Sequence, residues 1–305
     1  IDSDPVDATV DFLPGNSVPF RFTDEREGRR LSTDALRERI EASILGLTPV
    51  TETLKPEAVR PQVYRAELEG AIVLRSRIVV PLSGSEAAQA NAALAAAALN
   101  GLRVDAGETL SFNQTVGLRT SEAGYQVAEE PAYGQNVSGV GGGVCQVSTA
   151  LYRLALLGGL EIGERNAAVY PVDYCDVGQE AAVSDQGLDL KIVNSTGMPV
   201  FLTARVYADG DGQTMEFQLI GLELEESYTL ASETETIAPP EEPIYVRDSE
   251  GRYAAYSDER IPVGEPMPGY RVTVRLISET DEKIVSQDEY DAIPQIIYVG
   301  VSQRP

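Results

Sequence analysis

The residues best suited to chemistry lie in one glycine-rich segment, Gly139-Val-Gly-Gly-Gly-Val-Cys-Gln-Val-Ser-Thr-Ala-Leu-Tyr152. Its glycines permit backbone geometry that side chains forbid, and the pattern predicts a helix from about Gln146 to Leu157. Cys145 is then expected near a helix N-terminus, where N–H groups and the helix dipole stabilise a thiolate. Gly142 and Gly143 would offer amides to an oxyanion, so a cysteine nucleophile is one hypothesis. The commoner alternative is a buried structural cysteine.

The 305-residue chain contains no histidine. This removes the commonest general base and the commonest transition-metal ligand. Asp173, Tyr174 and Glu180 could carry a proton instead, but the sequence favours structural roles for them. Asp173 and Glu180 are expected to be solvated loop charges, and Tyr174 a half-buried strand residue. No metal site or cofactor is predicted.

The composition excludes several classes of partner. The chain has 48 acidic and 24 basic residues, a formal net charge of -24. Such a charge repels polyphosphate backbones and anionic lipid, so nucleic-acid binding is not expected. No apolar run approaches the roughly 20 residues that span a bilayer, so no transmembrane segment is predicted. Because the chain opens on Ile1 and not on Met, we expect that an N-terminal export signal or anchor is missing from it.

The elements that must position the glycine-rich segment follow from local patterns. Strand-like runs at 8–12 and 18–22 flank a Pro14-Gly15-Asn16 turn and predict a hairpin. Helical spacing predicts a helix over 35–45, so residues 1–68 are expected to form a small α+β unit. Ser85 and Glu86 open an alanine-rich helix, expected over 86–99, after a strand at 78–80.

The second half of the chain is dominated by strand patterns. Runs at 188–193, 200–207 and 215–220 are separated by turn residues and predict a three-stranded meander. The acidic, proline-containing stretch at 223–242 is typical of a linker or an exposed edge. Short strands between 244 and 300 predict a small all-β module. The fold class is therefore expected to be α+β, with several domains.

The glycine-rich segment resembles the signature of the VanW family. Gly141-Gly-Gly-Val-Cys-Gln-Val-Ser-Thr149 carries the resemblance, followed by Leu151-Tyr152. Further matching segments occur in the family's order, at Leu99–Gly101, Gly107–Asn113, Val116–Thr120, Ala123–Tyr125, Pro171–Tyr174 and Asn194–Pro199. The resemblance covers about residues 78–221.

The flanking segments resemble other envelope domains. Residues 1–68 are similar to a peptidoglycan-binding domain that precedes VanW domains, and residues 222–305 resemble, more weakly, a glycine-containing all-β domain. These resemblances imply three domains: 1–68, 78–221, and 222–305 with its acidic linker. They also imply a protein on a bacterial cell surface, held by an N-terminal anchor. The expected partners are peptidoglycan or cell-wall glycan, with other envelope proteins or self-assembly as further possibilities.

The chain departs from the VanW pattern at one position that matters for chemistry. Many VanW domains carry a histidine after the cysteine helix, and Ala168 stands there in this chain. Without that base a thiol of ordinary pKa is mostly protonated near neutrality. Because Cys175 adjoins the segment that faces the cysteine in relatives, we also predict a Cys145–Cys175 disulfide, which would contribute roughly 3–4 kcal/mol. Two buried thiols are the alternative.

These observations favour a non-catalytic binding or structural role in the cell envelope. One alternative is a cysteine-dependent enzyme that modifies peptidoglycan through Cys145, and another is a surface-layer or filament subunit. Tyrosine rings could also line a glycan groove by stacking on sugars, at Tyr125, Tyr133, Tyr152, Tyr170 and Tyr174. The candidate binding residues are Gly141, Gly142, Gly143, Gln146, Ser148, Thr149, Arg119, Tyr125 and Tyr174.

Overall fold

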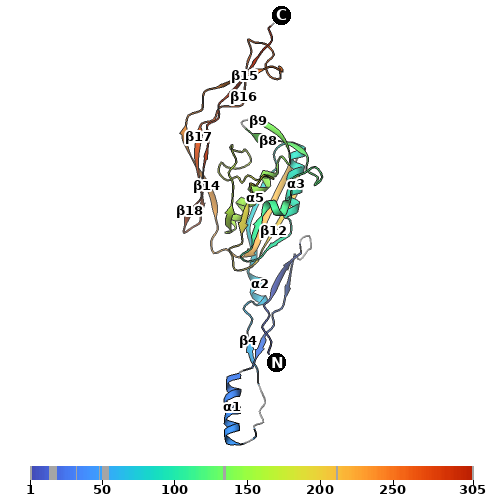
Figure 1. The fold of residues 1–305 in the computed structure, drawn as a ribbon, viewed down its shortest axis with the longest axis vertical. Helices are drawn as coiled ribbons and strands as arrows, with labels where there is room; N and C mark the ends of the chain where they lie inside the picture. The colour runs from blue at the N-terminus through green and yellow to red at the C-terminus, as the bar shows by residue number, and fades with distance from the viewer. Residues whose placement is uncertain are drawn as a thin grey trace. The chain divides into compact units, whose positions relative to one another are not determined.

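The computed structural model describes residues 2–13, 19–31, 33–47, 49, 55–132, 135–210 and 212–303. The chain divides into two compact units, Ile1–Val73 and Leu74–Pro305. Helices and several small sheets occur together (Figure 1), which confirms the expected α+β, multidomain class. The predicted boundaries at 68, 78 and 221 stay predictions.

The smaller unit is built from short, locally paired strands and two helices. Strand β1 (Thr9–Phe12) pairs antiparallel with β2 (Phe20–Thr23), which confirms the hairpin, and its Pro14-Gly15-Asn16 turn lies outside the described residues. The helix expected over 35–45 is α1 (Thr33–Gly46). The remaining elements are β3 (Gly28–Arg30), β4 (Glu57–Val59) and α2 (Arg65–Ala71).

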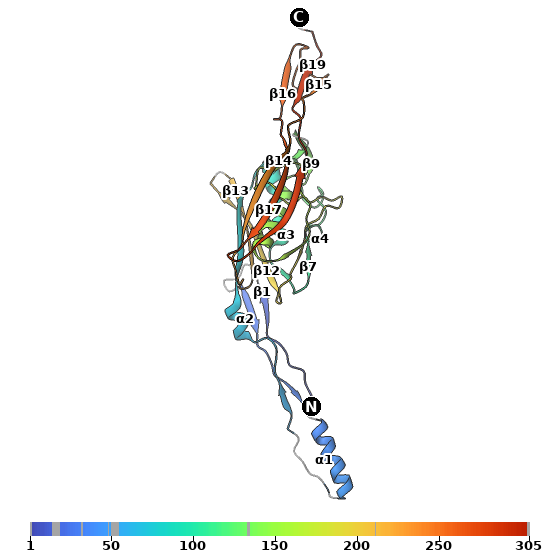
Figure 2. The same ribbon diagram turned by 90° about the vertical axis from the view of Figure 1, so that its left-hand side faces the viewer.

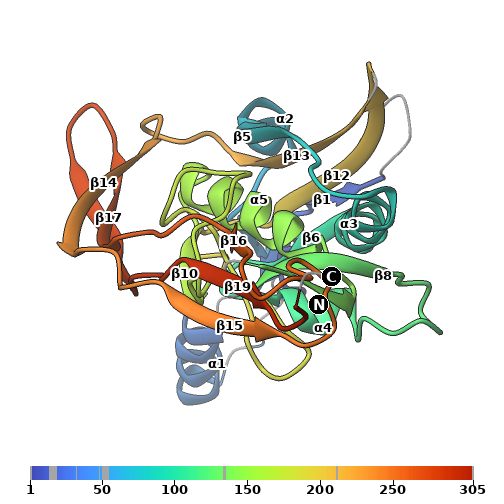
Figure 3. The same ribbon diagram turned by 90° about the horizontal axis from the view of Figure 1, so that it is seen from above.

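The larger unit is centred on a four-stranded sheet with the order β5-β13-β12-β6. These strands are β5 (Ile72–Pro81), β13 (Gly212–Leu222), β12 (Val200–Asp209) and β6 (Leu102–Val104). Met215, Phe217 and Leu219 alternate along β13 into the main core, so Glu216 between them points to the opposite face. Helices α3 (Glu86–Leu99) and α5 (Val144–Leu157) contact this sheet and each other (Figure 3).

Helix α3 begins and ends where the sequence predicts. The Ser85 side chain caps it by accepting a hydrogen bond from the Ala88 amide at 3.3 Å. Its buried face is made of alanines together with Asn91 and Leu99. Small side chains on this face let α5 come close, and this positions the glycine-rich segment.

The predicted meander is only partly correct. The hairpin β12–β13 is present, but β11 (Lys191–Val193) pairs with β7 (Thr109–Ser111) and β10 (Glu161–Glu164) in a separate sheet. The turn after β11 explains the difference, because the side-chain amide of Asn194 donates hydrogen bonds to the backbone carbonyls of Val104 and Met198, at 2.9 Å each. The side chain of Asn194 thus redirects the chain from one sheet to the next.

Two further three-stranded sheets complete the larger unit. One has the order β14-β17-β18, formed by β14 (Thr229–Ala238), β17 (Gly269–Ile277) and β18 (Glu282–Tyr290) (Figure 2). The stretch expected to be a linker or exposed edge is thus largely the edge strand β14. The other sheet contains β15 (Ile244–Asp248), β19 (Ile296–Gly300) and β16 (Arg260–Val263). Also present are α4 (Phe112–Val116) and the hairpin of β8 (Val127–Ala132) with β9 (Gln135–Val140).

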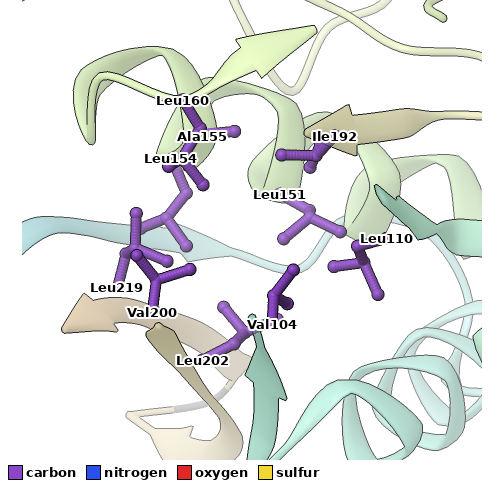
Figure 4. Close-up of a pocket in the computed structure, with 10 residues that line it drawn as sticks. All are labelled: Val104, Leu110, Leu151, Leu154, Ala155, Leu160, Ile192, Val200, Leu202 and Leu219. Carbon is purple, nitrogen blue, oxygen red and sulfur yellow. The ribbon is translucent and has the colours of Figure 1, made fainter. Parts of the chain in front are cut away.

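The main core is largely aliphatic, with a few buried aromatic rings, and it contains a small cavity. A cavity of about 20 Å³ lies between α5, the four-stranded sheet and the β10-β11-β7 sheet, and only aliphatic side chains line it (Figure 4). A cavity this small and apolar stays dry, because a water molecule would find no hydrogen-bond partner in it. Across the described ranges, no helix is both long and apolar enough to span a membrane.

Candidate functional site

The glycine-rich segment leads directly into α5, as the sequence predicts. Gly143 is the N-cap residue, with a left-handed φ of 99°, and Val144 is the first helical residue. The helix thus starts two residues before the expected Gln146, and Cys145 lies within its first turn. The expectation that Cys145 lies at a helix N-terminus is confirmed.

The three consecutive glycines are required by close backbone contacts. A Cβ atom added to any of them would come within 3.0 Å of a neighbour. The nearest atoms would be Arg119 Cβ at 2.8 Å from Gly141, the Ala128 carbonyl oxygen at 2.9 Å from Gly142, and the Ala88 carbonyl oxygen at 2.4 Å from Gly143. Asn91 of α3 holds the segment by donating to the Gly142 carbonyl at 2.9 Å. The glycines therefore have a packing role that accounts for them without an oxyanion.

The thiols of Cys145 and Cys175 interact electrostatically with the Tyr174 phenol, which also forms a hydrogen bond with Thr149. The Cys145 thiol donates to the Val183 carbonyl at 3.6 Å. Burial raises the pKa of the Tyr174 phenol, and the two neighbouring cysteines raise it further. Burial also raises the pKa of the Cys175 thiol to about 12, with a further contribution from Glu180. Tyr174 and Cys175 therefore keep their protons near neutral pH, and neither is a ready proton acceptor.

The predicted Cys145–Cys175 disulfide is not formed in the structure, which contains both residues as half-buried thiols. The reason is local, since the Cys145 sulfur is turned towards the carbonyl of Val183. Tyr174 is half-buried as expected, but it lies in a bend and not in a strand.

Three predicted polar residues of α5 anchor neighbouring segments. Gln146 accepts a hydrogen bond from the Ser83 amide at 2.9 Å and so holds the loop between β5 and α3. The Ser148 hydroxyl donates to the Ala181 carbonyl at 2.6 Å, and the Thr149 hydroxyl accepts from the Ala181 amide at 3.0 Å. All three side chains are buried. The hydrogen bonds of Ser148 and Thr149 tie α5 to the segment that carries Tyr174.

Arg119 and Tyr125 are buried, and Arg119 packs closely against Gly141. The Arg119 guanidinium pairs with Asp185 at 2.6 Å and donates to Asn113 Oδ1 at 2.8 Å. Burial raises the pKa of the Tyr125 phenol. Tyr125 and Tyr152 are 4% and 1% exposed, so their ring faces cannot stack on a glycan in this structure. Tyr170 and Tyr174 are partly exposed, and Tyr133 lies outside the described residues.

A buried ionic cluster, which we call the Arg165 cluster, was not found by sequence reasoning. Arg165 donates to Asp288 at 2.5 Å and to Glu180 at 3.1 Å, and Tyr290 also donates to Glu180. Glu180 is 1% exposed, so the expectation of a solvated loop charge was wrong for this residue. That expectation holds for Asp173, which is exposed. The cluster joins the segment after α5 to strand β18.

Arg153 is a second residue that the sequence analysis missed. It lies one turn beyond Thr149 on α5 and lines a small hollow of about 10 Å³. The signal in the sequence was a lone charge inside the apolar helical run Leu151-Tyr-Arg-Leu-Ala-Leu-Leu157. Within the described parts of the chain, no cluster of three or more His, Cys, Asp or Glu residues could hold a metal ion.

Comparisons with known proteins agree with the sequence resemblance. Residues 87–219 match the protein family described as VanW like protein. YoaR of Bacillus subtilis (strain 168) is 32% identical over 196 residues, which are 63% of this chain and 63% of YoaR. Vancomycin B-type resistance protein VanW of Enterococcus faecalis (strain ATCC 700802 / V583) is 35% identical over 111 residues, 35% of this chain and 40% of that protein.

The chain thus spans less than two thirds of the length of either relative. No solved structure matches it significantly. The resemblances of residues 1–68 and 222–305 to other envelope domains stay predictions. Residues 87–219, which hold the glycine-rich segment, α5 and both cysteines, are supported as a VanW family domain.

Proposed function

We propose that this chain is a non-catalytic binding protein of the bacterial cell envelope, which associates with peptidoglycan through the surface beside α5. The similarity to VanW and YoaR supports a cell-envelope-related protein. The proposal that the protein is not an enzyme rests on the surroundings of the Cys145 sulfur. Its thiol donates to a carbonyl, the adjacent Tyr174 phenol holds its proton, and the chain has no histidine.

This arrangement is unsuited to acyl transfer because such a mechanism needs a base to take the thiol proton and an acid to protonate the leaving group. A carbonyl oxygen supplies neither function. A phenol of raised pKa is a poor base at neutral pH. The hydrogen bonds of Gln146, Ser148 and Thr149 instead brace α5 as a rigid platform.

The proposal is tested by co-sedimentation of the purified chain with peptidoglycan sacculi. We expect retention well above that of an unrelated protein of similar negative charge, and unchanged retention for Cys145→Ser. Retention equal to the control protein would contradict the binding role. Loss of retention in Cys145→Ser, with an unchanged melting temperature, would contradict the proposal that the thiol is not involved.

An enzyme that acts through Cys145 is the second candidate, favoured by the position of this residue in the first turn of α5. It predicts rapid alkylation of Cys145 at pH 7 and release of fragments from sacculi, abolished in Cys145→Ser. Our proposal predicts slow alkylation that denaturant accelerates, and no released fragments.

A further inference from the structure

The hollow beside α5 combines one cation with walls of apolar and uncharged polar side chains. Val80 and Pro81 of β5 form one side, and Ala150 lies on the helix face between Thr149 and Arg153. Tyr174 also lines the hollow. The charge of Arg153 also acts on the Cys175 thiol in the segment after α5, and it lowers the pKa of that thiol against the larger effect of burial.

The guanidinium of Arg153 is incompletely satisfied. Its Nε is buried and has no hydrogen-bond partner among the described residues. In the same set of residues, no ion pair includes Arg153, whereas Arg119 and Arg165 each pair with a carboxylate in the same domain. A buried donor without a partner costs free energy. The chain has 48 acidic residues, yet none of those that the structure describes forms an ion pair with Arg153.

We propose that the Arg153 hollow binds the terminal carboxylate of a peptide, and this inference rests on the proposed envelope-binding function. The planar guanidinium presents paired donors that match a carboxylate. The space of about 10 Å³ has room for about one water molecule, so it could admit a carboxylate oxygen but not a sugar ring, and the rest of the peptide would lie outside it. Val80 and Pro81 would contact a small side chain next to the carboxylate.

The charge count also favours a carboxylate over phosphate. One guanidinium neutralises a single negative charge, and the remaining lining groups of the hollow are uncharged side chains. Elsewhere the surface is strongly acidic, which disfavours a polyanionic polymer. A short peptide with one free carboxylate and a small final side chain meets both conditions.

The test measures binding of N-acetyl-dialanine, in its L,L and D,D forms, to the full chain by isothermal titration calorimetry and by chemical-shift changes. We expect at least one form to bind, and its C-terminal amide to bind at least tenfold more weakly. Arg153→Gln should weaken binding of the free acid at least tenfold. The matched control is Arg260→Gln, which removes an exposed arginine of β16 and should leave the affinity unchanged.

Several results would overturn the inference. These are equal affinity for acid and amide, equal affinity of Arg153→Gln and the parent chain, or inorganic phosphate binding at Arg153 more tightly than either acid. If Arg153→Gln does not fold, the affinities of the parent chain for the acid and for the amide still show whether the carboxylate is recognised. Sacculus binding by the parent chain together with any of these results leaves the proposed function standing and removes only the carboxylate site.

Discussion

The contact between Gly143 and α3 gives the sharpest test of how the glycine-rich segment is held. Gly143→Ala places a Cβ 2.4 Å from the carbonyl oxygen of Ala88 and 2.9 Å from its carbonyl carbon. Both atoms belong to the backbone of α3, so they cannot rotate away as a side chain would. The left-handed φ of 99° adds a cost of about 1–2 kcal/mol for any residue with a Cβ.

Overpacking a rigid site costs about 1–3 kcal/mol, so we expect Gly143→Ala to lose about 2–5 kcal/mol of unfolding free energy. Gly107→Ala is the matched control, because Gly107 has a φ of 77° and nothing within 4 Å of an added Cβ. It should lose only the backbone part, about 1–2 kcal/mol.

Urea denaturation followed by circular dichroism measures both losses. A unit of this size shifts its melting temperature by about 2–4 °C per kcal/mol, so thermal melts provide an independent check. If Gly143→Ala costs no more than Gly107→Ala, the close approach of α5 to α3 is not what requires glycine at position 143.

Three further predictions concern buried titratable groups. Arg165→Met should destabilise the larger unit by about 3–5 kcal/mol in urea, because it leaves the buried carboxylate of Glu180 and the half-buried one of Asp288 without their cation. Combining it with Asp288→Asn should cost less than the sum of the single losses, and simple additivity would refute this coupling. Hydrogen bonds from Arg77, and to a lesser extent from Arg205 and Gln218, lower the pKa of Glu216 to about 2. This is below its unfolded value of about 4.3. The stability from this group is therefore present above about pH 4 and lost as the pH falls towards 2, so Glu216→Gln should flatten the pH dependence of unfolding in that range. Cys175, with its pKa raised to about 12, should alkylate slowly at pH 8 in the native protein and rapidly in denaturant, as mass spectrometry would show; equal rates would contradict its burial.

Local patterns in the sequence determined much of the scaffold. The capped, alanine-rich helix α3 has the predicted bounds, because a helix cap and helix propensity act over a few neighbouring residues. The same reasoning placed Cys145 at the start of α5 and predicted the hairpins β1–β2 and β12–β13. The absence of histidine, which restricts the chemistry of the site, is a property of the sequence alone.

Tertiary structure alone decided which polar groups are buried and what they contact. Glu180 looked like a loop charge, yet it is enclosed because Arg165 and Tyr290 come to it, the latter from 110 residues away. Strand β11 does not join the expected meander, because the side chain of Asn194 donates a hydrogen bond to the carbonyl of Val104, 90 residues earlier. Burying a charge or an amide is tolerable only when partners satisfy it, and partners this distant leave no periodic trace in the sequence. For the same reason, only the folded chain reveals that Arg153 lines a hollow with its Nε unsatisfied.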